Sequence, residues 1–403
     1  MPSQSGAAPV NLGERIAAID IIRGFALFGV LWMNLHEHRG LAMPYGALDH
    51  LPTAWIDKYL GAATNWLMQG KAQCLFSLLF GFGFANIMSR LEARGLPAGR
   101  IFLRRIGVLM LFGLINAFLL FVGDILVGYA LMGFVLYFTR RWSMRRLLLV
   151  GLPLTVLSGP VLALLTQILW DGQGYWNNLF DEGARIRGTL FLQSDPAAYV
   201  GELWRANWVE WYGTPPWWAY VGQILGRFML GSWMFRKGWF TDLPAYRDLF
   251  RKTLLIALPT GLALSGLAVA NAAFGLGPAG LGGALSPTGA LLLASAYASA
   301  IVLLHMAGHC MVLFAGLAAV GRMALTNYIM QSLFYIFAVY GFGLGLMAML
   351  GATLSLGLAV VLFALQIAFS RWWLSRYRFG PLEWIWRCLT YGQRQPMRLP
   401  HSG

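Results

Sequence analysis

Residues 351–371 read GATLSLGLAVVLFALQIAFSR, and Arg371 is the only charged side chain in this run. A helix needs about 20 mostly apolar residues to cross the hydrocarbon core of a bilayer. The run reaches that length before its first charge, so it predicts a membrane-spanning helix.

The rest of the chain has the same character. Of its 403 residues, 58% are hydrophobic and 11% are charged, whereas a soluble domain carries about 25% charged residues. This composition predicts an all-α, polytopic membrane helix bundle of about ten transmembrane helices. The nine other predicted spans are 16–35, 72–90, 104–121, 125–140, 147–170, 217–235, 253–274, 287–320 and 324–345.

Two segments leave alternatives open. The stretch 287–320 is too long for one straight span, and Gly308 inside it marks a kink or a break. Residues 53–69 are amphipathic and rich in aromatic side chains. This pattern favours an interfacial helix, with a true span as the alternative.

The chain is expected to form one membrane domain. Residues 1–13 are small and polar and predict a disordered tail, whereas residues 14–392 form the domain and residues 393–403 a basic tail. The two C-terminal motifs described below fall within 216–392. No segment has the composition of a separate soluble domain.

The formal net charge of +14 would suggest nucleic acid as a partner for a soluble protein. In a membrane protein, Lys and Arg instead collect in the cytoplasmic loops. With both termini in the cytoplasm, most basic residues fall on that side and most acidic residues on the other. Two long outward loops, 36–70 and 171–216, then follow. We therefore expect lipids as partners and no nucleic acid.

The three cysteines, Cys74, Cys310 and Cys388, are far apart in the sequence. An odd number without paired spacing fits neither a disulfide framework nor a zinc site. We expect free thiols.

A short helix motif follows the last span. Phe379-Gly380-Pro381-Leu382-Glu383-Trp384-Ile385-Trp386-Arg387-Cys388-Leu389-Thr390 has a Gly-Pro break and then Glu383 and Arg387 one turn apart. A second motif, Gly321-Arg322-Met323-Ala324-Leu325-Thr326-Asn327-Tyr328, begins the ninth span. An isolated apolar helix needs neither pattern, so both indicate a family signature.

Three N-terminal motifs agree with these two. They are Asp20-Ile21-Ile22-Arg23-Gly24-Phe25-Ala26-Leu27-Phe28-Gly29, Leu75-Phe76-Ser77-Leu78-Leu79-Phe80-Gly81-Phe82-Gly83, and Gly123-Asp124-Ile125-Leu126 followed by Tyr129-Ala130. With these five motifs in order, the chain resembles the YeiB-like family of bacterial membrane proteins, known as domain of unknown function 418.

The resemblance extends distantly to multi-span membrane acyltransferases. It implies an acyltransferase-like fold in the bacterial cytoplasmic (inner) membrane, a cytoplasmic acyl donor such as acyl-CoA with no bound cofactor, and an outward-facing acceptor. In that wider group a His follows the early Arg by eleven residues, but here the residue is Asn34. A second position that often carries His is Asn116. The resemblance therefore does not supply a histidine-centred mechanism.

Ionisable groups within spans are costly unless they are paired or hydrated, so each one is a candidate site. Asp20 and Arg23 lie on one helical face and predict either a buried ion pair or part of a donor pocket. Asp124 precedes an apolar run. It is a candidate general base if burial raises its pKa, and a candidate helix cap otherwise.

Histidines form two groups. His36 and His38 follow the first span, with His36 as the first candidate for acid–base chemistry and His38 as the second; the alternative is that both are solvated loop residues. With His50 they are a weak metal-site candidate, because nothing fixes a third ligand. His305 and His309 are four apart, and we expect them on one helical face. They predict two packed, hydrogen-bonded histidines more than a metal or proton-relay site.

The remaining polar candidates lie towards the C-terminus. Asn327 and Gln331 share a face and predict either a polar lining or hydrogen bonds between helices. Glu383 and Arg387 predict a structural clasp on the cytoplasmic side. The residues expected to form a substrate or donor pocket are Asp20, Arg23, Asn34, Asn116, Tyr129, Arg322, Asn327 and Gln331.

These features favour a membrane-embedded acyl-group transferase acting on an extracytoplasmic sugar, lipid or small molecule. Asp124 and His36 are its expected catalytic residues. A transporter or flippase of an amphipathic or anionic small molecule is the alternative, and a non-catalytic envelope protein ranks third. No metal site is expected.

Overall fold

The computed structural model describes residues 16–42, 48–170, 173–193, 195–275, 280–341 and 343–399, so the predicted tail 1–13 lies outside the described residues. This part of the chain is all-helical; its single β-contact is an isolated bridge between Tyr377 and Arg398. The α-helices are α1 (Ala17–Ala42), α2 (Ala54–Leu67), α3 (Lys71–Ala93), α4 (Ala98–Ile115), α5 (Leu126–Phe138), α6 (Met144–Trp170), α7 (Gln173–Leu192), α8 (Pro196–Ala206), α9 (Pro215–Arg236), α10 (Arg247–Phe274), α11 (Leu281–Met306), α12 (Met311–Arg322), α13 (Ala324–Phe334), α14 (Ala352–Leu374) and α15 (Pro381–Tyr391). Three π-helical segments are η2 (Asn116–Leu120), η3 (Asn207–Tyr212) and η5 (Tyr335–Val339), and two 3-10 segments are η4 (Pro244–Tyr246) and η6 (Leu346–Met349).

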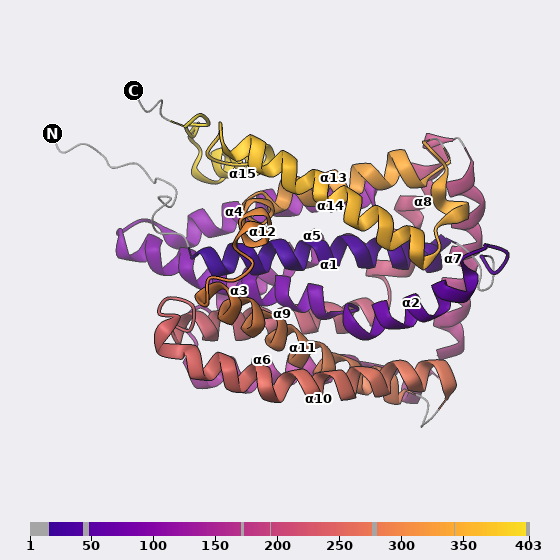
Figure 1. Cartoon of the computed structure of the whole chain (residues 1–403), viewed down its shortest axis with the longest axis horizontal. Helices are drawn as coiled ribbons and strands as arrows, with labels where there is room; N and C mark the ends of the chain where they lie inside the picture. The colour runs from indigo at the N-terminus through magenta and orange to yellow at the C-terminus, as the bar shows by residue number, and fades with distance from the viewer. Residues whose placement is uncertain are drawn as a thin grey trace.

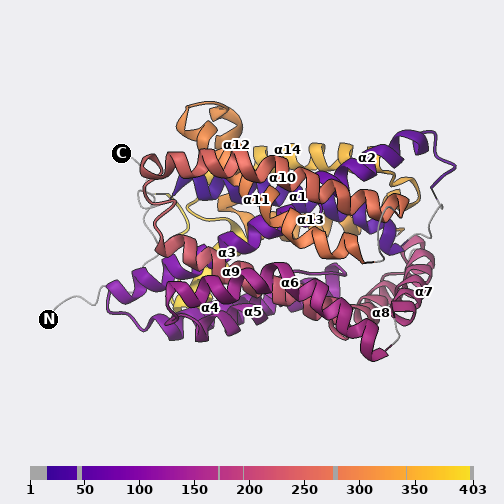
Figure 2. The ribbon, with the colours of Figure 1, turned by 90° about the horizontal axis from the view of Figure 1, so that it is seen from below.

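The long helices run roughly along one axis of the molecule (Figure 1). Helix α15 lies at one end of this axis and helices α7 and α8 lie at the other; we call these the α15 end and the α7–α8 end. Seen from below, α4, α5 and α6 form one layer and α10, α13 and α14 another (Figure 2). Helix α1 packs against α3, α12 and α14, so the N-terminal span is central to the bundle.

Several helices have the length and composition of membrane spans. Seven described segments meet both criteria, and the bent pair α12–α13 brings the number to eight. Helix α5 is apolar but shorter, and α9 carries Gln223 and Arg227 in its middle. All ten predicted spans are helical, but α5 and α9 are less typical of membrane spans than the sequence suggested.

The long stretch 287–320 is divided at the glycine that suggested a break. Helix α11 ends at Met306, and Gly308 in the following turn has a φ of +71°. This left-handed conformation is readily available to glycine. Helix α12 then begins at Met311 and bends by 84° into α13.

Helix α2 covers the segment predicted as interfacial. It packs along the bundle: the Trp66 indole donates a hydrogen bond to the Leu262 carbonyl of α10 at 2.8 Å. The Asp57 carboxylate accepts one from the Thr353 amide of α14 at 2.7 Å. Together, α2 and α3 form one apolar helical segment of 40 residues, so α2 extends the candidate membrane span of α3.

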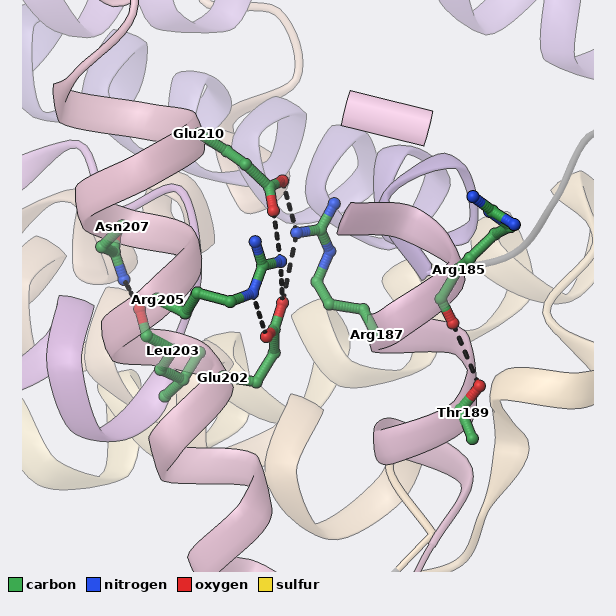
Figure 3. A network of polar contacts seen from close by, with 8 residues as sticks. All are labelled: Arg185, Arg187, Thr189, Glu202, Leu203, Arg205, Asn207 and Glu210. Carbon is green, nitrogen blue, oxygen red and sulfur yellow. Dashed lines mark hydrogen bonds and ion pairs between the residues drawn. The ribbon is translucent and has the colours of Figure 1, made fainter. Parts of the chain in front are cut away.

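The region predicted as the outward loop 171–216 contains α7, α8 and η3, which form a helical cap. Four charged residues join these elements (Figure 3). The fully buried Arg187 pairs with Glu210 at 2.5 Å and with Glu202 at 3.5 Å. Arg205 pairs with the same two carboxylates. The network pairs charges that would be costly to bury alone, and it joins α7, α8 and η3.

Candidate functional site

A cavity of about 280 Å³ opens among helices at the α15 end. Its wall is built from α1, α3, α4, α5, α12, α13 and α15, so it brings together segments from the whole chain. The interior is largely apolar, with Phe76, Leu79, Phe80 and Leu109 among its lining side chains. A pocket of this kind suits the apolar part of a ligand.

The polar lining is rich in positive charge. The arginines that line the cavity are Arg23, Arg90, Arg105, Arg322 and Arg387, and the carboxylates are Asp20 and Glu383. Arginine binds carboxylate and phosphate groups with a planar fork of donors. The excess of guanidinium groups therefore favours an anionic ligand.

Asp20 and Arg23 combine the two roles predicted for them. Arg23 Nη1 donates to Asp20 Oδ1 at 2.7 Å, one turn apart on α1, and both side chains line the cavity. The same guanidinium nitrogen reaches the Gly321 carbonyl at 3.5 Å. The pair thus fixes α1 beside the end of α12.

Glu383 clamps α15 to the start of α13. Its Oε1 accepts hydrogen bonds from the Leu325 amide at 2.7 Å and the Thr326 amide at 3.1 Å. Its Oε2 accepts from the Thr326 hydroxyl at 2.6 Å. Burial raises the pKa of the Glu383 carboxyl, and these hydrogen bonds oppose that rise. The two signature motifs therefore meet at the cavity.

The partner of Arg387 is different from the one its spacing suggested. Its guanidinium lies 4.4 Å from the centre of the Phe379 ring. No direct ion pair joins it to Glu383 in the described part of the chain. Arg105 on α4 stacks over Trp386, 3.6 Å from the ring centre, so α15 is held to α4 as well as to α13.

Two tyrosines, Tyr129 and Tyr328, line the cavity. The Tyr129 hydroxyl bonds Ser77 at 2.8 Å and donates to the Gln73 carbonyl at 3.3 Å. The Tyr328 hydroxyl donates to Asp124 Oδ1 at 3.3 Å and accepts from the Ile125 amide at 3.4 Å. Tyr328 therefore separates the cavity from Asp124 by one side chain.

Asp124 lies in the turn between η2 and α5, with 1% of its surface exposed. The Val127 amide donates to Oδ2 at 2.9 Å, so the carboxylate does cap α5. Asn116 Nδ2 donates to Oδ1 at 2.7 Å. Burial raises the Asp124 pKa to about 7, although these bonds act to lower it. The capping role and a role in proton transfer near neutral pH are thus compatible.

Asn327 and Gln331 lie away from the cavity, in the seam between α13 and α14. Asn327 Nδ2 donates to Ser370 Oγ at 3.0 Å, and Gln331 Nε2 donates to Gln366 Oε1 at 3.1 Å. Gln366 returns a bond to the Asn327 carbonyl at 2.8 Å. This arrangement matches the predicted hydrogen bonding between helices.

The structure does not bring His36 to the cavity. It is a buried residue of α1, not a solvated loop residue, and its ring faces Gly61 of α2. Asn34 interacts with the Tyr335 hydroxyl. The side chain of His38 lies outside the described residues, and His50 is exposed.

The expected common face of His305 and His309 is wrong. Helix α11 ends between them, so His305 stands at the helix terminus and His309 is exposed in the turn. His305 packs edge-on to Phe314, and its Nδ1 has no hydrogen-bond partner. Within the described residues, no group of three His, Cys, Asp or Glu side chains is placed to hold a metal ion.

Sequence reasoning missed three polar residues that line the cavity, Asn86, Arg90 and Arg105. The two arginines were counted only as charges that set topology. The spacing along α4 could have identified Arg105. It lies three residues after Phe102 and four before Leu109, both of which are buried, so it shares their inward face of the helix. Its neighbour Arg104 is exposed, so the periodicity separates the two.

Comparison with known proteins agrees with the family resemblance that the five motifs indicated. A family profile described as "Protein of unknown function (DUF418)" matches residues 234–393. The chain is 29% identical to the uncharacterised protein YxaH of Bacillus subtilis, covering 98% of both chains. These matches support a YeiB-like DUF418 family for the chain, as its five motifs indicated. The chain is also 28% identical to the uncharacterised protein YeiB of Escherichia coli, over 94% of this chain and 96% of YeiB.

The family profile covers both C-terminal motifs that meet at the cavity. It includes Arg322 and the Glu383 clamp, whereas the two full-length relatives cover the N-terminal half of the site as well. No solved structure matches the chain. Both relatives are themselves uncharacterised, so they assign no activity to the cavity.

Proposed function

We propose that the protein is a membrane-embedded acyl-group transferase with a donor site in the cavity at the α15 end. The observation that carries the proposal is the combination of groups that line this cavity. Five arginines and a largely apolar interior line it, and the lining residue Tyr328 bonds the buried carboxyl of Asp124. An amphipathic anion with a reactive end would match this combination.

An acyl-CoA has the required chemistry. Its phosphate groups would contact the arginines, which bind such groups through paired N–H donors. Its acyl end would enter the apolar interior beside Phe76 and Phe80. A volume of about 280 Å³ suits the acyl end of the donor, so the nucleotide would remain at the mouth.

The basic residues support a cytoplasmic position for this mouth. Arg236 at the end of α9 donates to the Arg140 carbonyl, and both lie at the end of the bundle that also carries the Arg141–Arg146 segment. Lys and Arg collect on the cytoplasmic side of membrane proteins. We place the protein in the bacterial cytoplasmic membrane, with both termini and the α15 end inside.

Asp124 would act as the general base. The carboxylate would take the proton of an acceptor hydroxyl while its oxygen attacks the thioester carbonyl. The carbon–sulfur bond would then break, and the departing sulfur would take this proton from Asp124, so that coenzyme A leaves as the thiol and the carboxylate is restored. A pKa of about 7 is close to the pKa that makes a base effective at neutral pH. His36 has no role in this scheme, because it lies away from the cavity.

Mass spectrometry of envelope lipids, glycans and secreted small molecules would test the proposal. The strains are a deletion mutant and the same mutant carrying wild-type protein, Asp124→Asn or the control Asp195→Asn. Asp195 caps α8 far from the cavity, and Asn is an equally good cap. We expect one product heavier by an acyl group with wild type and the control, and a loss of about 100-fold or more with Asp124→Asn. Full product with Asp124→Asn would refute the assignment.

Transport of an amphipathic anion is the second candidate. The 84° bend between α12 and α13 favours it, since four residues around the bend line the cavity: Gly321, Arg322, Ala324 and Leu325. Transporters often bind their substrates at interrupted helices. In proteoliposomes, movement of an unmodified compound across the membrane without a covalent product would decide for transport.

A further inference from the structure

A second polar group of side chains lies on α9, behind the aromatic wall of the cavity. Phe80, Tyr129 and Phe228 form this wall, with ring centres 4.4 to 5.6 Å apart. Arg227 directly precedes Phe228 on α9 and is 2% exposed. Its charge reaches the Tyr129 hydroxyl and the Cys74 thiol. Arg227 thus stands next to the cavity without lining it.

Arg227 lacks the counter-charge that a buried guanidinium requires. Its only hydrogen bond in the described structure is from Nη2 to Gln223 Oε1 at 2.8 Å, and its buried Nε has no partner. No carboxylate forms an ion pair with it in that part of the chain. A buried charge without a partner costs several kcal/mol in a protein interior, so such a residue in a span is a functional-site candidate.

Another buried arginine shows how such a charge is paired in this protein. Arg187 is held between two carboxylates (Figure 3). Arg227 is about as buried but bonds only a neutral amide. The difference points to a missing anionic partner.

The neighbours of Arg227 extend towards Asp124. Tyr220, Gln223 and Arg227 are spaced by three and four residues, which places them on one face of α9. The Tyr220 hydroxyl is buried without a hydrogen-bond partner. It lies within reach of the charges of both Arg227 and Asp124. A ligand bound to Arg227 would therefore have a second unused donor, the Tyr220 hydroxyl, on the same helix face.

We propose that Arg227 binds a carboxylate or phosphate group of the acceptor, so that the acceptor is an anionic molecule. This inference rests on the proposed function in naming the ligand as the acceptor. The anion site itself rests on the burial and missing partner of Arg227. Gln223 holds one side of the guanidinium, which leaves Nε and its neighbouring donors for the anion. Tyr220 would donate a further hydrogen bond to it.

Thermal unfolding of the purified protein in detergent tests the site with inorganic phosphate as the probe, at constant ionic strength. We expect phosphate to raise the Tm of the wild type by roughly 2–4 °C at saturation. Without phosphate, Arg227→Met should unfold at the wild-type temperature or above, because it removes an unpaired buried charge. Arg187→Met, which breaks a satisfied network, should unfold at a clearly lower temperature.

A second pair of variants separates Arg227 from the arginines of the cavity. Arg322→Gln should still be stabilised by phosphate, and the double variant Arg322→Gln, Arg227→Met should not. A fall in the Tm of Arg227→Met as large as that of Arg187→Met would overturn the proposal. An equal phosphate response with and without Arg227 would also overturn it.

The acylated product distinguishes this inference from the proposed function. Product formed in full by Arg227→Met would leave the transferase standing and remove Arg227 from acceptor binding. Phosphate binding that depends on Arg227, with no acylated product in any strain, would support the anion site and refute the transferase.

Discussion

Replacing Glu383 tests whether the contact between the two signature motifs stabilises the fold. The carboxylate accepts two amide hydrogen bonds and one hydroxyl hydrogen bond from α13. In Glu383→Ala these donors lose their partner at the start of the helix. We expect the free energy of unfolding of Glu383→Ala to fall. That of Glu383→Gln should fall less, because the amide oxygen still accepts hydrogen bonds from the backbone.

The size of the effect follows from these three bonds. A hydrogen bond to a charged group contributes about 1.5–3 kcal/mol, and loss of a helix cap costs about 0.5–2 kcal/mol. Glu383 is half-buried, so water can replace part of the loss. We therefore expect about 3 kcal/mol for Ala and about 1 kcal/mol for Gln.

Denaturant unfolding in detergent, followed by tryptophan fluorescence, measures the change. Glu92→Ala is the matched control, because this exposed glutamate at the end of α3 has no hydrogen bond of this kind. If Glu383→Ala unfolds with the same free energy as Glu92→Ala, the clamp does not stabilise the fold and the reasoning is refuted.

Three further predictions follow from the packing and the buried charges. The Asp124 pKa is about 7 in the folded protein against an ordinary 3.8, so between these pH values the folded state keeps a proton that the unfolded state loses. The free energy of unfolding should therefore fall from about pH 4 to pH 7. Asp124→Asn should flatten this fall in a pH series of unfolding curves. Gly81→Ala should lower stability by about 1–3 kcal/mol, because the added methyl group meets the backbone of α9, whereas Gly83→Ala, with open space, should not; equal stabilities would contradict this. Arg187→Gln should cost about 3–5 kcal/mol, and limited proteolysis should cut the cap of the variant faster than that of the wild type.

The sequence was informative where hydrophobicity alone determines structure. Runs such as 351–371 predicted helices that the structure confirms, and Gly308 predicted the break after α11. The cap of α7 and α8 was missed because its stability comes from ion pairs between residues such as Arg187 and Glu210. Pairing between distant charges leaves no periodic signal in a single sequence.

The cavity was predictable only in part. Asp20, Arg23, Tyr129 and Arg322 were expected in a pocket and do line one. Asn327 was expected with them, but it points into the α13–α14 seam. The face on which a polar residue of a span lies depends on the neighbouring helices, and spacing along one helix does not give it.

The place of α15 in the cavity wall has a consequence for biosynthesis. The Trp386 indole donates to the Arg105 carbonyl at 2.8 Å, a contact across 281 residues of sequence. All preceding helices must therefore be synthesised before the wall of α4 and α15 can close. Until then the arginines that line the cavity lack the cover of α15.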